Sequence, residues 1–429
     1  MDKFMQKLVC LWIILYVFDA PIQYILLMGG IQNIGIYLKM IIPVFVIFVG
    51  LYNMCKKPIV SKQFINILLL VFISVLIALI NQLPFIQIIY GLKTIIPFIF
   101  MYLYMTYIQK NNIRFDIIFR IVVPIVVMGI FLDKYLTFPW EGLGYQLGEY
   151  EVKVNRQWET FGMERLSGFQ RASYDSAIIL TILLLIRGLN YSIIAKRSFI
   201  FKTLDGLLTL MAIYAIYLTT FKSAYILIGA YFLVYLQIKF YNTVKGSLLG
   251  PISVLTTRVL FFLMFIYSIL PPLLSYIGHN NLFSKLINSN SLYRVILTSY
   301  DVRMTQTWPE SLYLLESTQF NGMLGRGIGG IGTAQKYAEP YMYNPADNIY
   351  VYLFVSVGFL IVPILISILK MIFSIELKSI KSYSKIVFLL VIFCYGATIN
   401  FIESPFIMAF LGLLLAYSSK LEKNPKILN

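Results

Sequence analysis

The side chains best suited to chemistry in this sequence are cations that stand at the edges of apolar segments. Arg165 and Arg171 lie six residues apart, directly before an apolar run. A guanidinium presents a planar fork of donors that matches a phosphate, so this pair is a candidate phosphate clamp. The alternative is that both side chains reach lipid headgroups. Lys222, in the segment TTFKS at 219–223 between two apolar runs, has the same two interpretations.

Three more arginines and an aspartate follow in one long polar segment. Arg294 and Arg303 are nine residues apart in a stretch with helical spacing of apolar residues, which places them on roughly opposite sides of a helix. Arg326 lies in the glycine-rich run GMLGRGIGGIG at 322–332, whose glycines permit tight turns or close approach to a ligand. No strand precedes this run, which excludes a dinucleotide-binding motif. Asp347 precedes an apolar run, where it either caps the helix or serves as a general base facing the arginines.

Lys93 is a cation inside an apolar run. It lies about eight residues into the run, or roughly 12 Å deep at 1.5 Å per residue. A charge at that depth is costly and usually faces a partner or a polar cavity. Asp19 lies at a comparable depth in the first apolar run and is the candidate partner. The pair is either structural or in contact with a substrate.

Metal and histidine chemistry have few candidates. The chain has one histidine, His279, and three cysteines, Cys10, Cys55 and Cys394, with no spacing typical of a metal or redox site. We therefore expect no metal ion and no other cofactor. His279 is most simply an exposed loop residue.

The composition predicts that helices in a bilayer position these side chains. Hydrophobic residues make up 59% of the 429 residues, charged residues 13%, and the mean hydropathy is +0.80. A soluble domain has about 25% charged residues, and spans of about 20 apolar residues cross a bilayer as helices. We predict an all-α polytopic membrane protein with 1–429 as a single transmembrane domain. The twelve candidate spans are 8–28, 34–52, 64–81, 85–108, 117–132, 173–190, 204–220, 222–240, 255–277, 348–370, 385–400 and 403–418.

The charge pattern predicts the orientation. If residue 1 is cytoplasmic, the segments expected inside hold 22 of the 35 Lys and Arg residues and 4 of the 19 Asp and Glu residues. Cytoplasmic loops collect Lys and Arg, so both the N- and C-termini are predicted to be cytoplasmic, with an uncleaved first helix. The net charge of +16 does not indicate nucleic acid, because no polar domain presents a basic face.

Two segments, 133–172 and 278–347, are too long to be simple connections and are predicted to be extracytoplasmic loops. Loops of this length usually have structure or function of their own. We expect both to contain short amphipathic helices, one of them over 293–308 and lying on the membrane. Trp158 and Trp308 either stack on sugar rings or belong to an interfacial aromatic belt. The chemistry is expected on this outer face.

The order of these features resembles the bacterial O-antigen polymerase and ligase superfamily, including the Wzy-type polymerases of capsule and exopolysaccharide pathways. The resemblance in architecture covers most of the chain. The resemblance in motif is confined to four places: RLSG at 165–168, TFKS at 220–223, the glycine-rich run with Arg326, and Asp347-Asn348 before an apolar span with Gly358. The ligases resemble one another in having histidine where this chain has Asp347. This departure favours a polymerase.

The resemblance implies a GT-C-like membrane glycosyltransferase that needs no metal. A growing glycan would pass from undecaprenyl diphosphate to a hydroxyl of a lipid-linked repeat unit on the outer face of the bacterial cytoplasmic membrane. A flippase and chain-length regulators would be its protein partners. Fixed cations would stabilise the departing diphosphate, and a carboxylate would take the hydroxyl proton. The expected catalytic residues are Asp347, Arg165 and Arg326, and the expected substrate-binding residues are Arg171, Lys222, Arg294, Arg303 and Lys93.

Two other functions remain open from the sequence. One is an O-antigen ligase, which would move finished glycan to another acceptor. The other is a flippase or transporter of lipid-linked oligosaccharide, which would use Lys93 and Asp19. Transporters often show internal repeats, and none is visible in this sequence.

Overall fold

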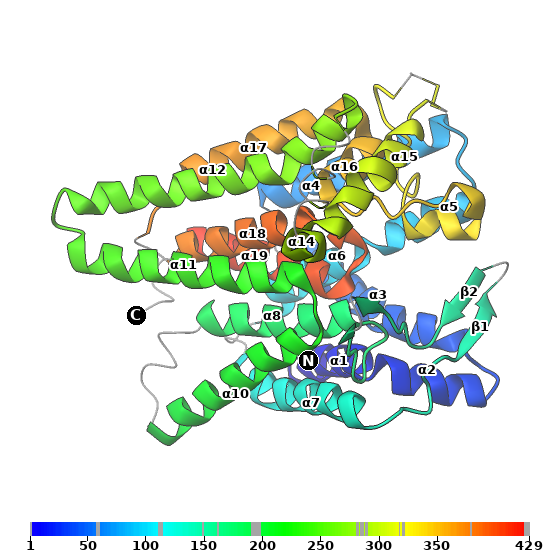
Figure 1. Ribbon diagram of the computed structural model, residues 1–429, viewed down its shortest axis with the longest axis horizontal. Helices are drawn as coiled ribbons and strands as arrows, with labels where there is room; N and C mark the ends of the chain where they lie inside the picture. The colour runs from blue at the N-terminus through cyan, green and yellow to red at the C-terminus, as the bar shows by residue number, and fades with distance from the viewer. Residues whose placement is uncertain are drawn as a thin grey trace. The chain divides into compact units, whose positions relative to one another are not determined.

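The chain is built mainly of α-helices (Figure 1). The structure is a computed structural model. It describes residues 2–56, 61–109, 115–147, 150–160, 163–189, 199–279, 283, 287, 291–316, 318–319, 322–377 and 380–423.

The helices and strands follow one another along the chain with short connections, apart from the two long loops. In order they are α1 (Asp2–Val17), α2 (Asp19–Met28), α3 (Ile34–Lys56), α4 (Lys62–Ile80), α5 (Phe85–Lys93), α6 (Ile96–Leu103), η1 (Tyr104–Ile108), α7 (Phe115–Tyr135), β1 (Gly144–Leu147), β2 (Tyr150–Lys153), β3 (Glu159–Thr160), β4 (Met163–Glu164), α8 (Ser173–Leu189), α10 (Phe199–Leu218), α11 (Lys222–Val244), α12 (Leu249–Tyr276), α14 (Ser291–Val302), η2 (Arg303–Thr307), α15 (Trp308–Tyr313), η3 (Thr333–Tyr337), η4 (Pro340–Met342), α16 (Ile349–Val357), η5 (Gly358–Leu360), α17 (Ile361–Phe373), α18 (Ile380–Gly396), η6 (Phe401–Glu403) and α19 (Pro405–Lys423).

Each of the twelve predicted spans falls on a helix or on a broken run of helices. Within the described residues, seven helical segments are long and apolar enough to cross a bilayer, and α1 with α2, bent by 78°, makes an eighth if counted as one span. Two shorter apolar helices, Tyr383–Gly396 and Pro405–Ser418, coincide with the last two predicted spans. The class of all-α membrane protein is therefore confirmed, and the count of twelve spans stays a prediction.

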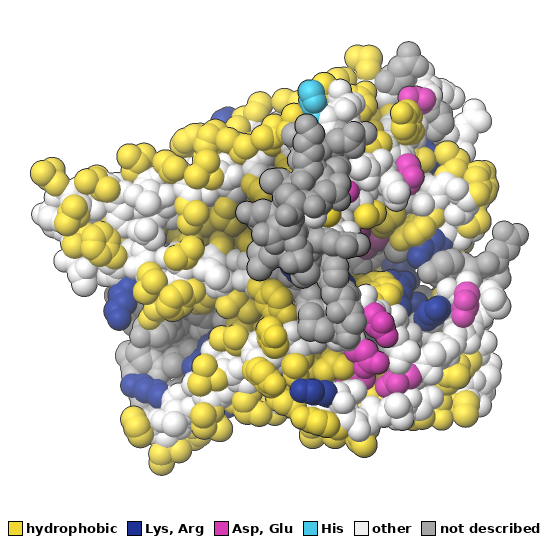
Figure 2. Space-filling view, viewed as in Figure 1, with side chains coloured by type: hydrophobic (Ala, Val, Ile, Leu, Met, Phe, Trp, Pro, Cys, Tyr) yellow, Lys and Arg dark blue, Asp and Glu magenta, His cyan; other side chains and the backbone are white. Residues whose placement is uncertain are grey.

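Large apolar side chains lie exposed along the long helices, as the space-filling view shows (Figure 2). On α12, Leu255, Leu263 and Leu270 are exposed, whereas Phe261 and Ser268 are buried. A helix that packs polar side chains inward and leaves leucines outward suits a lipid environment, because lipid is as apolar as leucine.

Contacts divide the chain into two compact units. Unit 1 comprises Met1–Ile59, Ile96–Ile228 and Pro405–Asn429, and unit 2 comprises Val60–Ile95 and Gly229–Ser404. Each unit is described by itself.

Unit 1 is organised around α6, which is almost entirely buried. Helix α19 packs against it, and a side chain on Gly412 would overlap the carbonyl of Phe98, so the two backbones approach closely. Trp12 of α1 is buried between the rings of Phe100 and Phe406, with ring centroids 5.3 and 5.6 Å away. These contacts link the first helix of the chain to the last.

The first long loop, in unit 1, differs from the prediction. Its described residues form two antiparallel hairpins, β1 with β2 and β3 with β4, where we expected amphipathic helices. The physical reason is visible in the sequence, since polar and apolar residues alternate over YEVKV at 150–154, as in a half-buried strand. Val152 and Val154 are buried in a cluster with Tyr145, Trp140 and residues of α2.

The second long loop, in unit 2, contains the predicted helix. It runs through α14, the π-helical turn η2 and α15. Tyr300, Met304, Trp308 and Leu312 recur every four residues and form the buried face of this helix. Trp308 is fully buried. It therefore belongs neither to an aromatic belt nor to a sugar-stacking surface, and both interpretations of this tryptophan are wrong.

Candidate functional site

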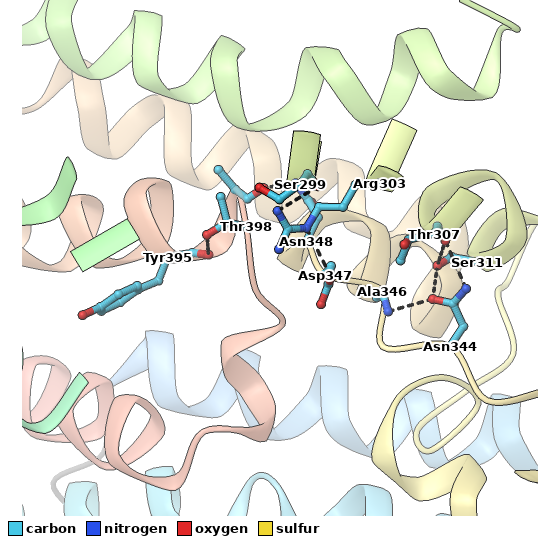
Figure 3. Close-up of polar contacts among 11 residues, drawn as sticks. Ser299, Arg303, Thr307, Ser311, Asn344, Ala346, Asp347, Asn348, Tyr395 and Thr398 are labelled. Atoms are coloured by element: carbon cyan, nitrogen blue, oxygen red, sulfur yellow. Dashed lines mark hydrogen bonds and ion pairs between the residues drawn. The ribbon is translucent and has the colours of Figure 1, made fainter. Parts of the chain in front are cut away.

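An ion pair joins Arg303 to Asp347 in unit 2. Nε of Arg303 lies 3.2 Å from Oδ2 of Asp347, with side-chain exposures of 18% and 35% (Figure 3). Arg303 begins the π-helical turn η2, and such turns frequently mark functional sites. An ion pair this exposed adds about 1 kcal/mol or less to stability. It leaves the carboxylate reachable by a ligand.

The backbone at Asp347 is strained. Ala346 and Asp347 have φ values of 61° and 46°, in the left-handed region that non-glycine residues rarely adopt. Each such residue costs roughly 1–3 kcal/mol and persists only where its surroundings enforce it, typically at functional sites. The structure places this strain directly on the predicted carboxylate.

Asn344 holds the strained turn from one side. Its Oδ1 accepts hydrogen bonds from Oγ of Ser311 (2.6 Å) and from the amide of Ala346 (2.8 Å). Its Nδ2 donates to the carbonyl of Thr307 at 3.1 Å (Figure 3). The turn that presents Asp347 is thus fastened to η2 and α15.

Asn348 holds the turn from the other side and caps α16. Its Oδ1 accepts from the amides of Tyr350 (2.8 Å) and Val351 (3.2 Å), and its Nδ2 donates to the carbonyls of Ser268 and Ala397. The helix cap is therefore Asn348, and the cap interpretation of Asp347 is wrong. Asn348 satisfies the first amides of the helix, so the carboxylate of Asp347 is directed to Arg303.

The glycine-rich run folds as a buried loop against protein backbone. The amides of Arg326 and Gly327 donate to the carbonyls of Val355 (2.7 Å) and Ser356 (2.9 Å), and the amide of Ile328 donates to Ser74 of α4 (3.0 Å). The glycines were expected to permit tight turns or close approach to a ligand. In the structure they form tight turns, and they approach the protein's own backbone.

This loop compensates a break in a membrane span. The span formed by α16, η5 and α17 is interrupted at Gly358, whose φ is 57°. A break frees carbonyls that lipid cannot satisfy. The amides of Arg326 and Gly327 reach two of them, and the amide of Phe359 in turn donates to Met323 of the loop at 2.9 Å. The run therefore forms a loop docked on a broken helix.

Arg326 uses its guanidinium inside this loop. It is 5% exposed, with Nη1 donating to the carbonyl of Gly330 at 2.7 Å and Nη2 to both carboxylate oxygens of Glu339 at 3.1 Å. Gln87 of α5 donates to Gly329 and to the same carboxylate. These contacts make Arg326 an organiser of the loop.

Glu403 is a residue of this region that sequence reasoning missed. It lies in the connection between α18 and α19, where its Oε1 accepts from the amide and Oγ1 of Thr333 at the end of the glycine run. Burial raises the pKa of Glu403 to about 7. The hydrogen bonds from Thr333 and the charge of Lys336 lower this pKa, and the charge of Asp347 raises it. Glu403 is therefore within electrostatic reach of Asp347. The available signal was an acid at the outer edge of the last apolar run.

Unit 1 brings together the other predicted cations. The amide of Arg165 donates to the carbonyl of Trp158 (2.9 Å), whose ring stacks on Tyr174. Tyr174 in turn contacts Phe221, the residue before Lys222 at the start of α11. Lys222 thus stands beside the segment of the first-loop arginines.

Two more arginines complete this group in unit 1. Nε of Arg171 donates to the carbonyl of Lys153 (2.7 Å), and its own carbonyl accepts from the amide of Arg156. Nη1 of Arg156 lies 3.4 Å from the hydroxyl of Tyr174. Sequence reasoning missed Arg156, which lies between the two unpredicted hairpins and pairs with Ala172 in an isolated bridge.

Asp133 supports the RLSG segment. Its Oδ2 accepts from the amides of Ser167 and Gly168, both at 2.7 Å. Burial raises the pKa of Asp133 to about 6 although these bonds lower it. The segment is therefore held by a carboxylate at the end of α7.

The remaining predictions concern Lys93 and Arg294. Lys93 ends α5 with its ammonium 5.3 Å from the ring centroid of Tyr90. Asp19, its expected partner, forms an ion pair with Lys39 in unit 1. Arg294 lies on α14, with its side chain outside the described part of the structure.

No protein-family model, curated protein or solved structure matches the chain.

Proposed function

We propose that this chain is a polysaccharide polymerase on the outer face of the bacterial cytoplasmic membrane, with both termini in the cytoplasm. It would transfer a growing glycan from undecaprenyl diphosphate to a lipid-linked repeat unit. The observation that supports this most is the Arg303–Asp347 pair, held on strained backbone at the start of a broken span. A partly exposed carboxylate with a fixed arginine suits proton removal from a hydroxyl.

The chemical step is a substitution at the anomeric carbon of the glycan. The acceptor hydroxyl oxygen forms the new bond to that carbon, and the bond from the carbon to the diphosphate oxygen breaks. Asp347 takes the hydroxyl proton, and undecaprenyl diphosphate leaves with the electron pair. Arg303 orients Asp347 through their 3.2 Å contact.

The departing diphosphate needs positive charge beside it. Arg165, Arg171 and Lys222 of unit 1 are proposed contacts of the lipid-linked substrate, and Arg156 is added to them because it shares their segment. Arg326 has its donors on Gly330 and Glu339, so in this proposal it fixes the loop that supports the site.

The test is cell-surface glycan analysis in a strain that carries variants of this chain in place of the native copy. Asp347→Asn and Arg165→Ala should each reach the membrane in normal amount and leave single repeat units on the final acceptor. Glu310→Gln, an exposed acid on α15, is the matched control and should give normal polymer. Normal polymer in Asp347→Asn would remove the carboxylate from the mechanism.

The same experiment separates the two alternatives. A ligase that has lost its function leaves long chains stranded on the carrier lipid. A flippase that has lost its function leaves single repeat units on the carrier lipid in the inner leaflet. Either pattern would replace the polymerase proposal.

A further inference from the structure

The connection between α18 and α19 contains a buried amide with no use inside the described structure. The side chain of Asn400 is 9% exposed, and within the described residues neither its Nδ2 nor its Oδ1 has a hydrogen-bond partner. Buried polar groups are nearly always hydrogen-bonded, because leaving one without a partner is destabilising. The hydrogen-bond partner of the Asn400 amide is therefore expected outside the folded chain.

One end of this connection is fastened to Asn348, the neighbour of Asp347, and the other end to Thr333. At the start, Nδ2 of Asn348 donates to the carbonyl of Ala397 at 3.2 Å. At the far end, Glu403 accepts from Thr333 and lies within electrostatic reach of Asp347. Figure 3 shows Thr398, just after the end of α18, near Asn348.

Asn400 stands between these two anchors, three residues from each. The amide of Glu403 donates to the carbonyl of Asn400 at 3.4 Å, and the amide of Ser404 donates to Phe401 at 2.9 Å. The backbone of this turn is therefore set by its own hydrogen bonds, and the Asn400 side chain is not needed to form it.

We propose that the Asn400 amide binds hydroxyl groups of the acceptor sugar beside Asp347. An amide offers two donors and an acceptor, and neighbouring sugar hydroxyls offer both kinds of partner. The substrate then supplies the hydrogen bonds that the free protein lacks. This inference rests on the proposed function and adds to it a residue that selects and places the acceptor.

The consequence for specificity follows from the burial. A site built to hydrogen-bond a hydroxyl strongly rejects analogues without it, because its own buried polar groups are then left without partners. Asn400 thus favours acceptor sugars with a free hydroxyl next to the one that reacts.

The test exploits opposite effects on stability. In Asn400→Leu an amide without partners is replaced by an apolar side chain of similar size, so the melting temperature of the purified full chain should stay the same or rise. In the matched control Asn344→Leu, a buried amide whose side chain makes hydrogen bonds to Ser311, Ala346 and Thr307 is lost, so the melting temperature should fall.

The functional measurements use undecaprenyl-diphosphate-linked repeat unit isolated from a strain lacking this protein. The apparent KM for chain growth should rise about tenfold in Asn400→Leu, the loss expected for one or two hydrogen bonds. The repeat unit should also raise the melting temperature of the native chain more than that of the variant.

The outcomes are distinguishable. A native chain that cannot elongate the repeat unit would overturn the proposed function and this inference with it. An active native chain with an unchanged KM in Asn400→Leu would overturn the role of Asn400 alone. A lowered melting temperature in Asn400→Leu would show that the amide serves the fold, which also overturns the inference.

Discussion

Replacing Gly325 by alanine should destabilise unit 2 by disturbing the docking of the glycine-rich loop. Gly325 has a φ of +76°, and an added Cβ would lie 2.7 Å from the carbonyl oxygen of Val355, the carbonyl carbon of Ser356 and the amide nitrogen of Gly358. All three are backbone atoms, so no side chain can rotate away. Relief requires the loop to move off the helix break, which weakens the bonds that Arg326 and Gly327 donate there.

The magnitude of the Gly325→Ala effect follows from two terms. A left-handed backbone costs alanine about 1–2 kcal/mol, and overpacking costs about 1–3 kcal/mol. The free energy of unfolding of unit 2 should fall by about 2–5 kcal/mol. For a unit of about 200 residues this corresponds to a fall in melting temperature of roughly 5–15 °C.

The chain supplies its own reporter for this measurement. Cys394 is buried in α18 of unit 2, whereas Cys10 and Cys55 are exposed. With Cys10 and Cys55 changed to serine, labelling of Cys394 by a thiol-reactive dye during heating reports the unfolding of unit 2. Gly229→Ala is the control, because a Cβ there meets nothing within 4 Å on a helix, and it should be neutral or stabilise by about 1 kcal/mol. Equal melting temperatures for Gly325→Ala and the native chain would refute the account of the loop.

Three further predictions concern charged groups. Asp205 is buried and accepts two bonds from Arg120, at 2.8 and 3.1 Å, so Asp205→Ala should lower stability by about 3 kcal/mol, measured by thermal unfolding; an unchanged melting temperature would contradict this. The pKa of Glu403 is raised to about 7 from 4.5, so the folded chain retains a proton that the unfolded chain releases. The stabilisation from Glu403 should therefore decline as pH rises from about 4.5 through 7, and Glu403→Gln should flatten this dependence in melting curves taken between pH 5 and 8. Arg303→Gln should cost less than about 1 kcal/mol in thermal unfolding, because its pair with Asp347 is partly exposed; a larger loss would indicate a structural pair.

Local pattern was enough to predict the helical elements. Long apolar runs mark the helices, and four-residue spacing of Tyr300, Met304, Trp308 and Leu312 marks the helix of the second loop. The hairpins of the first loop were predictable too, since residues 150–154 alternate. They were missed because the composition of the whole chain favours helices.

The site was less predictable, because its geometry depends on contacts between residues far apart in the sequence. Arg326 and Asp347 could be singled out by type and position. No local pattern shows that Arg326 forms an ion pair with Glu339 or that Asn348 is the N-cap of α16. Nor does any local pattern show that, within the described residues, the buried amide of Asn400 has no hydrogen-bond partner. These features depend on three-dimensional packing, which composition and spacing do not describe.

The docked glycine loop has a consequence for how the protein is made. The apolar segment from Ile349 to Phe373 enters the membrane with an interrupted backbone, and the groups that satisfy the interruption come from residues synthesised just before it. The same loop is also fastened to Ser74, which is synthesised far earlier, because the amide of Ile328 donates to its carbonyl. Unit 2 can therefore reach its final packing only after the segment Ile349–Phe373 has been inserted. Truncated chains that end before this segment should be cleared by membrane proteases.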